Sequence, residues 1–236
     1  MGLNAQTAVP VFTAGQVLTA AQVTQINTGI PVFATTTTRD AAFGGTGEKT
    51  LAQGQYAYIE ATSTLQVYNG SAWVNAISSG LNLITSQVIG TAVSSVTVSS
   101  AFSTTYDSYK IVIAGGAGSS ANAGIRMTLG ATATGYYYGI PVAIYSGGGY
   151  ASLAGTNTTS WEVGSVNAAS LNLNLELVDP FNTKITKVFA SIAKDTSGGA
   201  GGGFLDNTTS YTAFTLTPSA GTFTGGTIYV YGYAKA

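Results

Sequence analysis

Residues 170–178 have the sequence SLNLNLELV, in which leucine recurs at every second position. The residues between the leucines are Asn172, Asn174 and Glu176, so apolar and polar side chains alternate with a period of two. This alternation is typical of a β-strand with one face buried and the other turned to water. Similar bursts broken by glycine continue over residues 91–236, and the main part of the chain is therefore predicted to be β.

The same pattern predicts up to nine strands in the C-terminal part of the chain. They cover residues 93–98, 108–114, 125–129, 136–144, 160–166, 170–178, 185–193, 213–216 and 227–234. Short strands in this number, separated by glycine-rich turns, favour two antiparallel sheets packed face to face. We therefore predict a jelly-roll-like β-sandwich over residues 93–236. Residues 79–92 contain serine and glycine and are predicted to be a linker.

A small β-hairpin module is predicted over residues 35–78. Its signal is the dipeptide Asn69-Gly70 between two apolar runs, residues 65–68 and 71–74. This dipeptide tolerates the positive φ angles that both central residues of a type I′ turn require. A third strand is expected around Tyr56, Tyr58 and Ile59.

The two-residue turn predicts which residues of the hairpin face each other. Gln66 is expected opposite Trp73, and Val67 opposite Ala72. Side chains alternate along a strand, so the hairpin has two faces, both with apolar bulk. One face is predicted to hold Leu65, Val67, Ala72 and Val74, and the other Tyr68 and Trp73.

Residues 1–34 form a predicted attachment segment with the only helix expected in the chain, over residues 20–28. Thr19 and Gln22 are spaced as a capping box, and Gly29 with Pro31 supplies a stop signal. A helix this short is marginal in water. It is therefore expected to dock on its own chain, on sister copies or on a neighbouring protein.

Two further features are interpreted as structural. The charged pair Arg39-Asp40 is expected to be a surface or capping contact. The glycine run of residues 198–203 is not a phosphate-binding loop, because no Lys-Ser/Thr pair follows it. It is predicted to be a mobile loop tip.

The charge balance excludes one class of partner and favours another. The chain has 8 basic and 9 acidic residues among 236, for a net charge of −1. Nucleic acid is not an expected partner, because its binding needs a basic surface. Weak self-repulsion instead favours association between copies, and a homotrimer is expected.

Membrane insertion is not expected either. No apolar run approaches the roughly 20 residues of a membrane helix. Residues 1–10 also lack the basic start and apolar core of a secretory signal. Synthesis in a cytoplasm is therefore expected.

Catalytic groups are scarce. The chain has no histidine and no cysteine, which excludes Ser-His and Cys-His nucleophiles, disulfides and thiolate zinc sites. A glycosidase would need two converging carboxylates, and the candidates are Asp107, Glu162, Glu176, Asp179, Asp195 and Asp206. Glu176 lies at a polar strand position, and three of the aspartates lie in predicted turns. We expect a protein that is not an enzyme, with no catalytic residues, no cofactor and no bound metal.

Aromatic residues are the candidates for binding. A first group is Tyr136, Tyr137, Tyr138, Tyr145, Tyr150 and Trp161, and a second, on the last strand, is Tyr229, Tyr231 and Tyr233. Tyrosine offers a flat apolar face with a polar tip, suited to sugars and to protein contacts. Packing in the core and between subunits is the favoured interpretation. The residues proposed for receptor or subunit contact are Tyr145, Tyr150, Trp161, Tyr229, Tyr231 and Tyr233.

Several segments together resemble the tail-fibre and related virion fibre proteins of bacteriophages. In the C-terminal part they are FSTTYDSYKI (102–111), DNTTSY (206–211) and GGTIYVYG (225–232), and in the N-terminal part FTAGQVLTA (12–20) and LQVYNGSAW (65–73). The resemblance covers most of the chain. It carries no residue-level binding site.

The resemblance implies a homotrimeric structural protein on the tail or capsid surface of the virion, made in the host cytoplasm. It implies attachment to other virion proteins through the N-terminal region and a distal domain that contacts a host glycan or protein. Host contact is expected in loops with Tyr145, Tyr150 and Gly201. A capsid decoration or head fibre protein is the alternative, followed by a carbohydrate-active depolymerase and a cellular lectin.

Overall fold

The structure is a computed structural model that describes residues 13–20, 29–44, 49–77 and 80–234. The chain divides into two compact units, Met1–Ser78 and Ser79–Ala236. Apart from Ala20, the helix predicted over residues 20–28 lies outside the described residues. No helix in the described part of the chain is long and apolar enough to cross a membrane.

The N-terminal unit is built on one small sheet with strand order β1-β2-β3-β4. The strands are β1 (Val32–Phe33), β2 (Tyr56–Ile59), β3 (Thr64–Tyr68) and β4 (Trp73–Asn75). β1 lies parallel to β2, and the other pairs are antiparallel. The strand expected around Tyr58 is thus confirmed as β2.

The N-terminal unit also contains helices where only strands were expected. They are α2 (Thr36–Asp40) and the 3-10 turn η1 (Glu60–Thr62). α2 starts with a capping box in which Thr38 N donates to Thr35 Oγ1 at 3.2 Å and Thr35 N donates to Thr38 Oγ1 at 3.0 Å. Threonine replaces the usual Glu or Gln at the third helical position, so the usual pattern is absent.

The hairpin forms, but the predicted pairing is wrong by two residues. Tyr68 lies opposite Trp73 and Val67 opposite Val74, which leaves a four-residue loop instead of a type I′ turn. The side chain of Asn69 explains the longer loop, because its Oδ1 accepts the backbone N–H groups of Ser71 at 3.0 Å and Ala72 at 2.8 Å. A slip of two keeps every side chain on its face, so Tyr68 and Trp73 still share one.

The C-terminal unit is an antiparallel β-sandwich. Its strands are β5 (Leu81–Val88), β6 (Val96–Val98), β7 (Ser108–Ala114), β8 (Ala117–Gly118), β9 (Ala123–Leu129), β10 (Tyr136–Ile144), β11 (Tyr150–Thr158), β12 (Trp161–Val166), β13 (Leu171–Val178), β14 (Lys187–Ala193), β15 (Ser197–Leu205), β16 (Phe214–Pro218), β17 (Phe223–Thr224) and β18 (Thr227–Tyr233). The jelly-roll connectivity stays a prediction.

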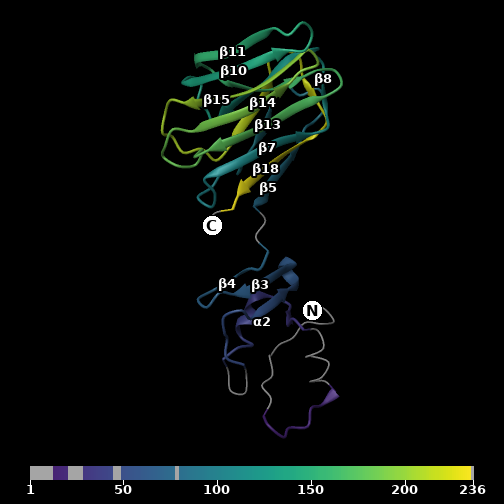
Figure 1. The fold of residues 1–236 in the computed structure, drawn as a ribbon, viewed down its shortest axis with the longest axis vertical. Helices are drawn as coiled ribbons and strands as arrows, with labels where there is room; N and C mark the ends of the chain where they lie inside the picture. The colour runs from purple at the N-terminus through teal and green to yellow at the C-terminus, as the bar shows by residue number, and fades with distance from the viewer. Residues whose placement is uncertain (1–12, 21–28, 45–48, 78–79, 235–236) are drawn as a thin grey trace. The chain divides into compact units, whose positions relative to one another are not determined.

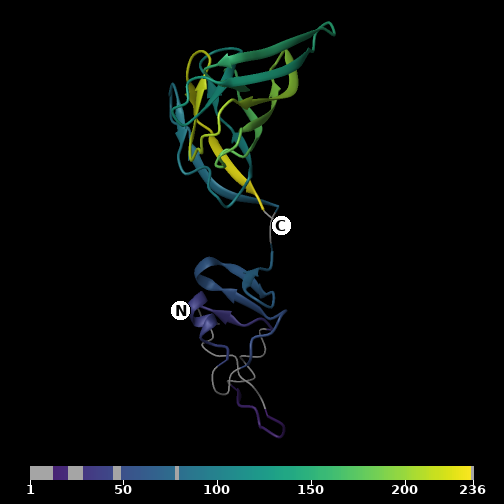
Figure 2. The same cartoon turned by 90° about the vertical axis from the view of Figure 1, so that its left-hand side faces the viewer.

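Two sheets form the layers of the sandwich. The large sheet has eight strands in the order β11-β10-β15-β14-β13-β7-β18-β5. Figure 1 labels them in this order from the top of the unit downward. The small sheet has four, in the order β12-β9-β16-β6. β13 joins them, because its start pairs with β12 and its end with β7 and β14. Figure 2 shows the unit from the side.

The core lies between the two sheets and follows the predicted alternation. All four leucines of β13 are buried, together with Ile111 of β7, Val188 of β14 and Val230 of β18. The small sheet contributes Met127, Leu129, Phe214 and Leu216. One predicted contact residue also lies in this core: Trp161 is 0% exposed, its ring is 5.0 Å edge-on from that of Tyr136, and its Nε1 donates to Phe204 O at 3.2 Å. The prediction of Trp161 as a surface contact is wrong.

Three strands of the large sheet lie outside the predicted set: β5, β11 and β15. β5 occupies most of the region predicted as a linker, residues 79–92, and pairs with β18 along its length. The sandwich therefore begins with β5 at Leu81 rather than at residue 93.

The glycine run of residues 198–203 is part of β15, inside the large sheet, and not a loop tip. β15 pairs with β10 on one side and β14 on the other. A Cβ on Gly199, Gly201 or Gly203 would overlap a carbonyl oxygen of β10. Glycine is therefore needed for close approach of two backbones.

Candidate functional site

One face of the sandwich departs from the usual surface of an antiparallel sheet. Side chains of the large sheet that point away from the core define what we call the outer face. They include Leu81, Leu83, Ser108, Lys110, Val112, Tyr137, Gly139, Asn174, Glu176, Val178, Lys187, Phe189, Ser191, Ala200, Gly202, Phe204, Tyr229, Tyr231 and Tyr233. Only three of these carry a charge, whereas a solvated sheet face is normally polar.

Strand register places the exposed apolar groups in rows across the outer face. In the central row, Phe189 lies opposite Glu176, while Tyr231 lies opposite Leu83. Phe189 is 53% exposed and Leu83 is 56% exposed. Two large apolar side chains of one row thus reach solvent on either side of Glu176 and Lys110.

Stacked rings extend the apolar surface at both ends of the sheet. The rings of Tyr137 and Phe204 are parallel within 3° with centroids 4.8 Å apart. The rings of Tyr229 and Tyr231 stack at 6.3 Å. Such pairs are rigid and flat, as is common at protein and sugar contacts.

A neutral polar network lies at the centre of the outer face. Tyr233 Oη donates a hydrogen bond of 2.6 Å to Glu176 Oε1, and Lys110 Nζ lies 3.4 Å from the same oxygen. The hydrogen bond from Tyr233 is the main cause that lowers the pKa of Glu176 below its ordinary value; Lys110 adds to it and partial burial opposes it. The same bond, with burial, raises the pKa of Tyr233 to about 12. Opposite charges therefore neutralise each other within the face.

Shallow hollows follow β14 and β15 across the outer face. One of about 560 Å³ lies between Lys110 and Phe189, and one of about 530 Å³ lies between Ile185, Phe189 and Phe204. Gly202 lines both. Because Gly202 has no side chain, the backbone forms the bottom of the hollow between the rings of Phe189 and Phe204.

The outward face of the small sheet provides an internal comparison. Its outward side chains are Thr97, Arg126, Thr128, Glu162, Thr215 and Thr217. Thr97 and Thr215 hydrogen-bond to each other at 2.9 Å, and Arg126 lies opposite Glu162. This face has the composition expected for contact with water.

The predicted contact residues fall in different places. Tyr229, Tyr231 and Tyr233 lie together on the outer face. Tyr145 and Tyr150, 61% and 84% exposed, flank the turn between β10 and β11. Gly201, expected in a loop beside them, lies within β15.

Sequence reasoning missed several apolar residues of this surface. Phe189 and Phe204 were not proposed, nor were Leu81 and Leu83. The sequence KVFASIA of β14 contained a signal, since Phe189 stands in the phase of Lys187 and Ser191 while Val188 and Ala190 are buried.

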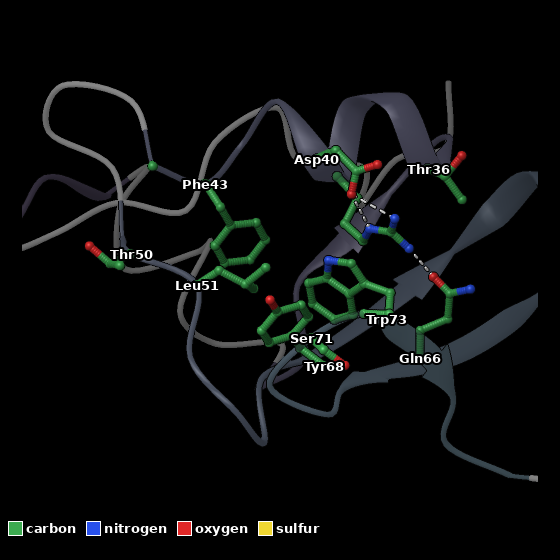
Figure 3. A pocket seen from close by; sticks show the side chains of 12 residues that line it. Thr36, Asp40, Phe43, Thr50, Leu51, Gln66, Tyr68, Ser71 and Trp73 are labelled. Atoms are coloured by element: carbon green, nitrogen blue, oxygen red, sulfur yellow. Dashed lines mark hydrogen bonds and ion pairs between the residues drawn. The ribbon is translucent and has the colours of Figure 1, made fainter.

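A second candidate site is a hollow of about 740 Å³ in the N-terminal unit, shown in Figure 3. Phe43, Leu51, Tyr68 and Trp73 supply apolar walls. The rings of Phe43 and Tyr68 lie 5.8 and 5.7 Å from that of Trp73.

Arg39 forms one end of this hollow. The prediction that the Arg39-Asp40 pair is a surface contact is therefore wrong for Arg39. Its side chain is buried, with the guanidinium carbon 4.7 Å from the centre of the Trp73 ring. It also donates to Gln66 and forms an ion pair of 2.6 Å with Asp40. Arg39 thus packs as a cation on an aromatic ring inside the N-terminal unit.

Several of the carboxylates considered for sugar hydrolysis are held in local structural contacts. Asn182 Nδ2 donates to Asp107 at 3.0 Å and to Asp179 at 2.6 Å. Glu162 lies 3.7 Å from Lys194. Within the described ranges, no cluster of three or more His, Cys, Asp or Glu side chains is placed to hold a metal ion.

Comparison with known proteins gives no match to a family model, a curated protein or a solved structure.

Proposed function

We propose that this chain is a structural protein of a bacteriophage virion, a homotrimeric tail fibre whose C-terminal sandwich contacts the host. The observation that carries the proposal is the contrast between the two faces of the sandwich. The outer face of the large sheet is apolar and aromatic, whereas the small sheet presents threonines and an Arg-Glu pair. A protein that works by surface contact needs such a face.

The division of the chain supports the same proposal. The chain consists of two compact units, a small N-terminal unit and the sandwich. In a fibre, the N-terminal unit attaches to another virion protein. The sandwich then presents the turn with Tyr145 and Tyr150, where two exposed aromatic rings flank the glycines of residues 147–149.

The location of the protein is tested on intact particles. Antibodies raised against the purified chain, detected by gold labelling in electron microscopy, should mark the tail of the phage that encodes it. Label on the capsid would favour the decoration or head-fibre alternative. Particles that carry no label, although the antibody recognises the denatured chain in infected cells, would contradict the proposal.

Host contact is tested by competition. The purified full chain should reduce adsorption of the phage to its host, and the double variant Tyr145→Ala/Tyr150→Ala should compete less well. A fragment used for this purpose must start before Leu81, because β5 belongs to the sandwich. Failure of the native protein to compete would contradict a receptor-binding role. Release of reducing sugar from host polysaccharide by the purified chain would instead favour a depolymerase.

A further inference from the structure

The outer face leaves large apolar side chains exposed to water, whereas the outward face of the small sheet does not. Leu81, Leu83, Phe189 and Phe204 are each between 39% and 56% exposed. They form two groups on the outer face, Leu81 and Leu83 on β5 and Phe189 and Phe204 on β14 and β15, with the Lys110–Glu176 ion pair between the groups. Exposed apolar patches rimmed by polar residues normally mark an interface.

The small sheet shows that this exposure is not a general property of the chain. The small sheet obeys the same alternation, yet its outward positions are filled by Thr97, Thr128, Thr215 and Thr217 together with one Arg and one Glu. Both faces belong to one sandwich with one core. The large sheet is therefore the face that fits a partner.

We infer that the outer face of the large sheet is the surface through which copies of this chain contact each other. This inference rests on the proposed homotrimer and names the surface that holds it together. The partner is a second copy of the same chain, and the next three paragraphs give the reasons.

The size of the outer face agrees with that of a stable interface. The large sheet has eight strands, each seven to nine residues long. With about 4.8 Å between strands and about 3.3 Å per residue, the sheet covers roughly 900 Å². A standard interface covers about 800 Å² on each partner, so this face has room for one contact of that size or for two smaller contacts, as a closed trimer requires.

The charges of the outer face also suit contact between identical copies. Lys110 and Glu176 neutralise each other within one copy, and Tyr233 satisfies the carboxylate further. Lys187 is the remaining charge of the face. Two copies can therefore meet here with little like-charge repulsion, which the net charge of −1 for the whole chain also keeps small.

A closed trimer further specifies which parts of the face meet. Contacts around a three-fold axis are heterologous, so one patch meets a different patch of the next copy. The outer face offers two such patches: β5 with β18, which carry Leu83 and Tyr231, and β14 with β15, which carry Phe189 and Phe204. We assign the contact to these two patches, with Lys110 and Glu176 between them.

The test is to place one charge in each patch. Phe189→Glu and Tyr231→Glu change outward side chains, so the sandwich should still fold, as circular dichroism and melting would verify. Thr97→Glu makes a matched change on the small sheet. Light scattering of the full chain should give three times the 23.8 kDa chain mass for the native protein and for Thr97→Glu. Each patch variant should dissociate at concentrations at least about 100-fold higher than the native trimer does.

Mixing the two patch variants tests the heterologous contact. Each variant keeps one intact patch, so an equimolar mixture can form one complete contact and should give a particle of two chains. A mixture that stays monomeric would overturn the division into two patches.

The other outcomes separate the inference from the proposed function. If the native chain and both patch variants are equally stable trimers, the outer face is not the interface, while the trimeric fibre stands. If the folded native chain is a monomer at 100 µM, the inference is wrong, and gold labelling of particles still decides the virion location independently.

Discussion

Replacing Gly201 by alanine should destabilise the sandwich although only one methyl group is added. In the strand β15, a Cβ at this position would overlap the carbonyl oxygen of Gly139 and lie 2.7 Å from the Cα of Ile140. β15 cannot move away from β10 freely, because β14 pairs with its other edge. The overlap must therefore be relieved by bending the sheet.

The size of the effect follows from these contacts. Overpacking a well-packed site costs about 1–3 kcal/mol. Weakening one or two backbone hydrogen bonds adds about 1 kcal/mol. We therefore expect a loss of about 3 kcal/mol in the free energy of unfolding, equivalent to a fall of roughly 6–12 °C in Tm for a domain of this size.

Thermal melting followed by circular dichroism measures this loss, and Gly139→Ala is the matched control. Gly139 lies on the adjacent strand, but no atom lies within 4 Å of the Cβ it would gain, and its φ is not positive. Its substitution should change stability by less than about 1 kcal/mol. If Gly201→Ala melts within 2 °C of the native protein, the close packing of β15 against β10 is refuted.

Three further predictions concern other parts of the chain. Gly70→Val should destabilise the N-terminal unit by about 1–3 kcal/mol because φ at this position is +101°, and hydrogen exchange should show faster opening of β3 and β4 but an unchanged sandwich. Trp161→Ala should lower stability by about 3–5 kcal/mol, as measured by urea unfolding, because the indole is fully buried; a smaller loss than Leu83→Ala would contradict its place in the core. The stability contributed by the hydrogen bond between Tyr233 and Glu176 should fall at both low and high pH. Because the pKa of Glu176 is lowered in the folded state, its contribution is present above the unfolded pKa and is lost as pH falls through the folded pKa. Because the pKa of Tyr233 is raised from 10 to about 12, its contribution is present below pH 10 and is lost as pH rises through about 12. Melting curves at pH 7 and pH 11 should therefore show a larger loss for the native protein than for Tyr233→Phe, and equal losses would count against this contact.

The strands that the sequence predicts best are those with side chains on both faces. β7 and β10 match their predicted bounds, because alternation is visible wherever a buried residue is followed by an exposed one. β15 could not be found in this way, since five of its nine residues are glycines and carry no side chain to alternate. In β5, Leu81 and Leu83 do follow the alternation. Both are exposed on an edge strand, however, and the sequence alone does not distinguish such a strand from a linker.

The candidate site was predictable only in part, for a related reason. Register parity places Tyr229, Tyr231 and Tyr233 on one face without any structure. Whether that face is the core or the surface depends on which sheet covers it, and this is a property of the tertiary fold. Trp161 gives the opposite case. Its large ring was consistent with a contact surface, but its position in β12 places it fully inside the core.

The first and last strands of the sandwich, β5 and β18, lie side by side, so the two ends of the domain are close together. Tyr233 is the register partner of Leu81, and Ala234 N donates to Gly80 O at 3.0 Å. A domain whose ends meet can be inserted into another chain, or circularly permuted, with little distortion of its host. A permutant that joins residue 234 to residue 80 and opens at Gly148 would keep every strand intact. Recombination could thus insert the whole sandwich into another protein, because its two junctions lie side by side.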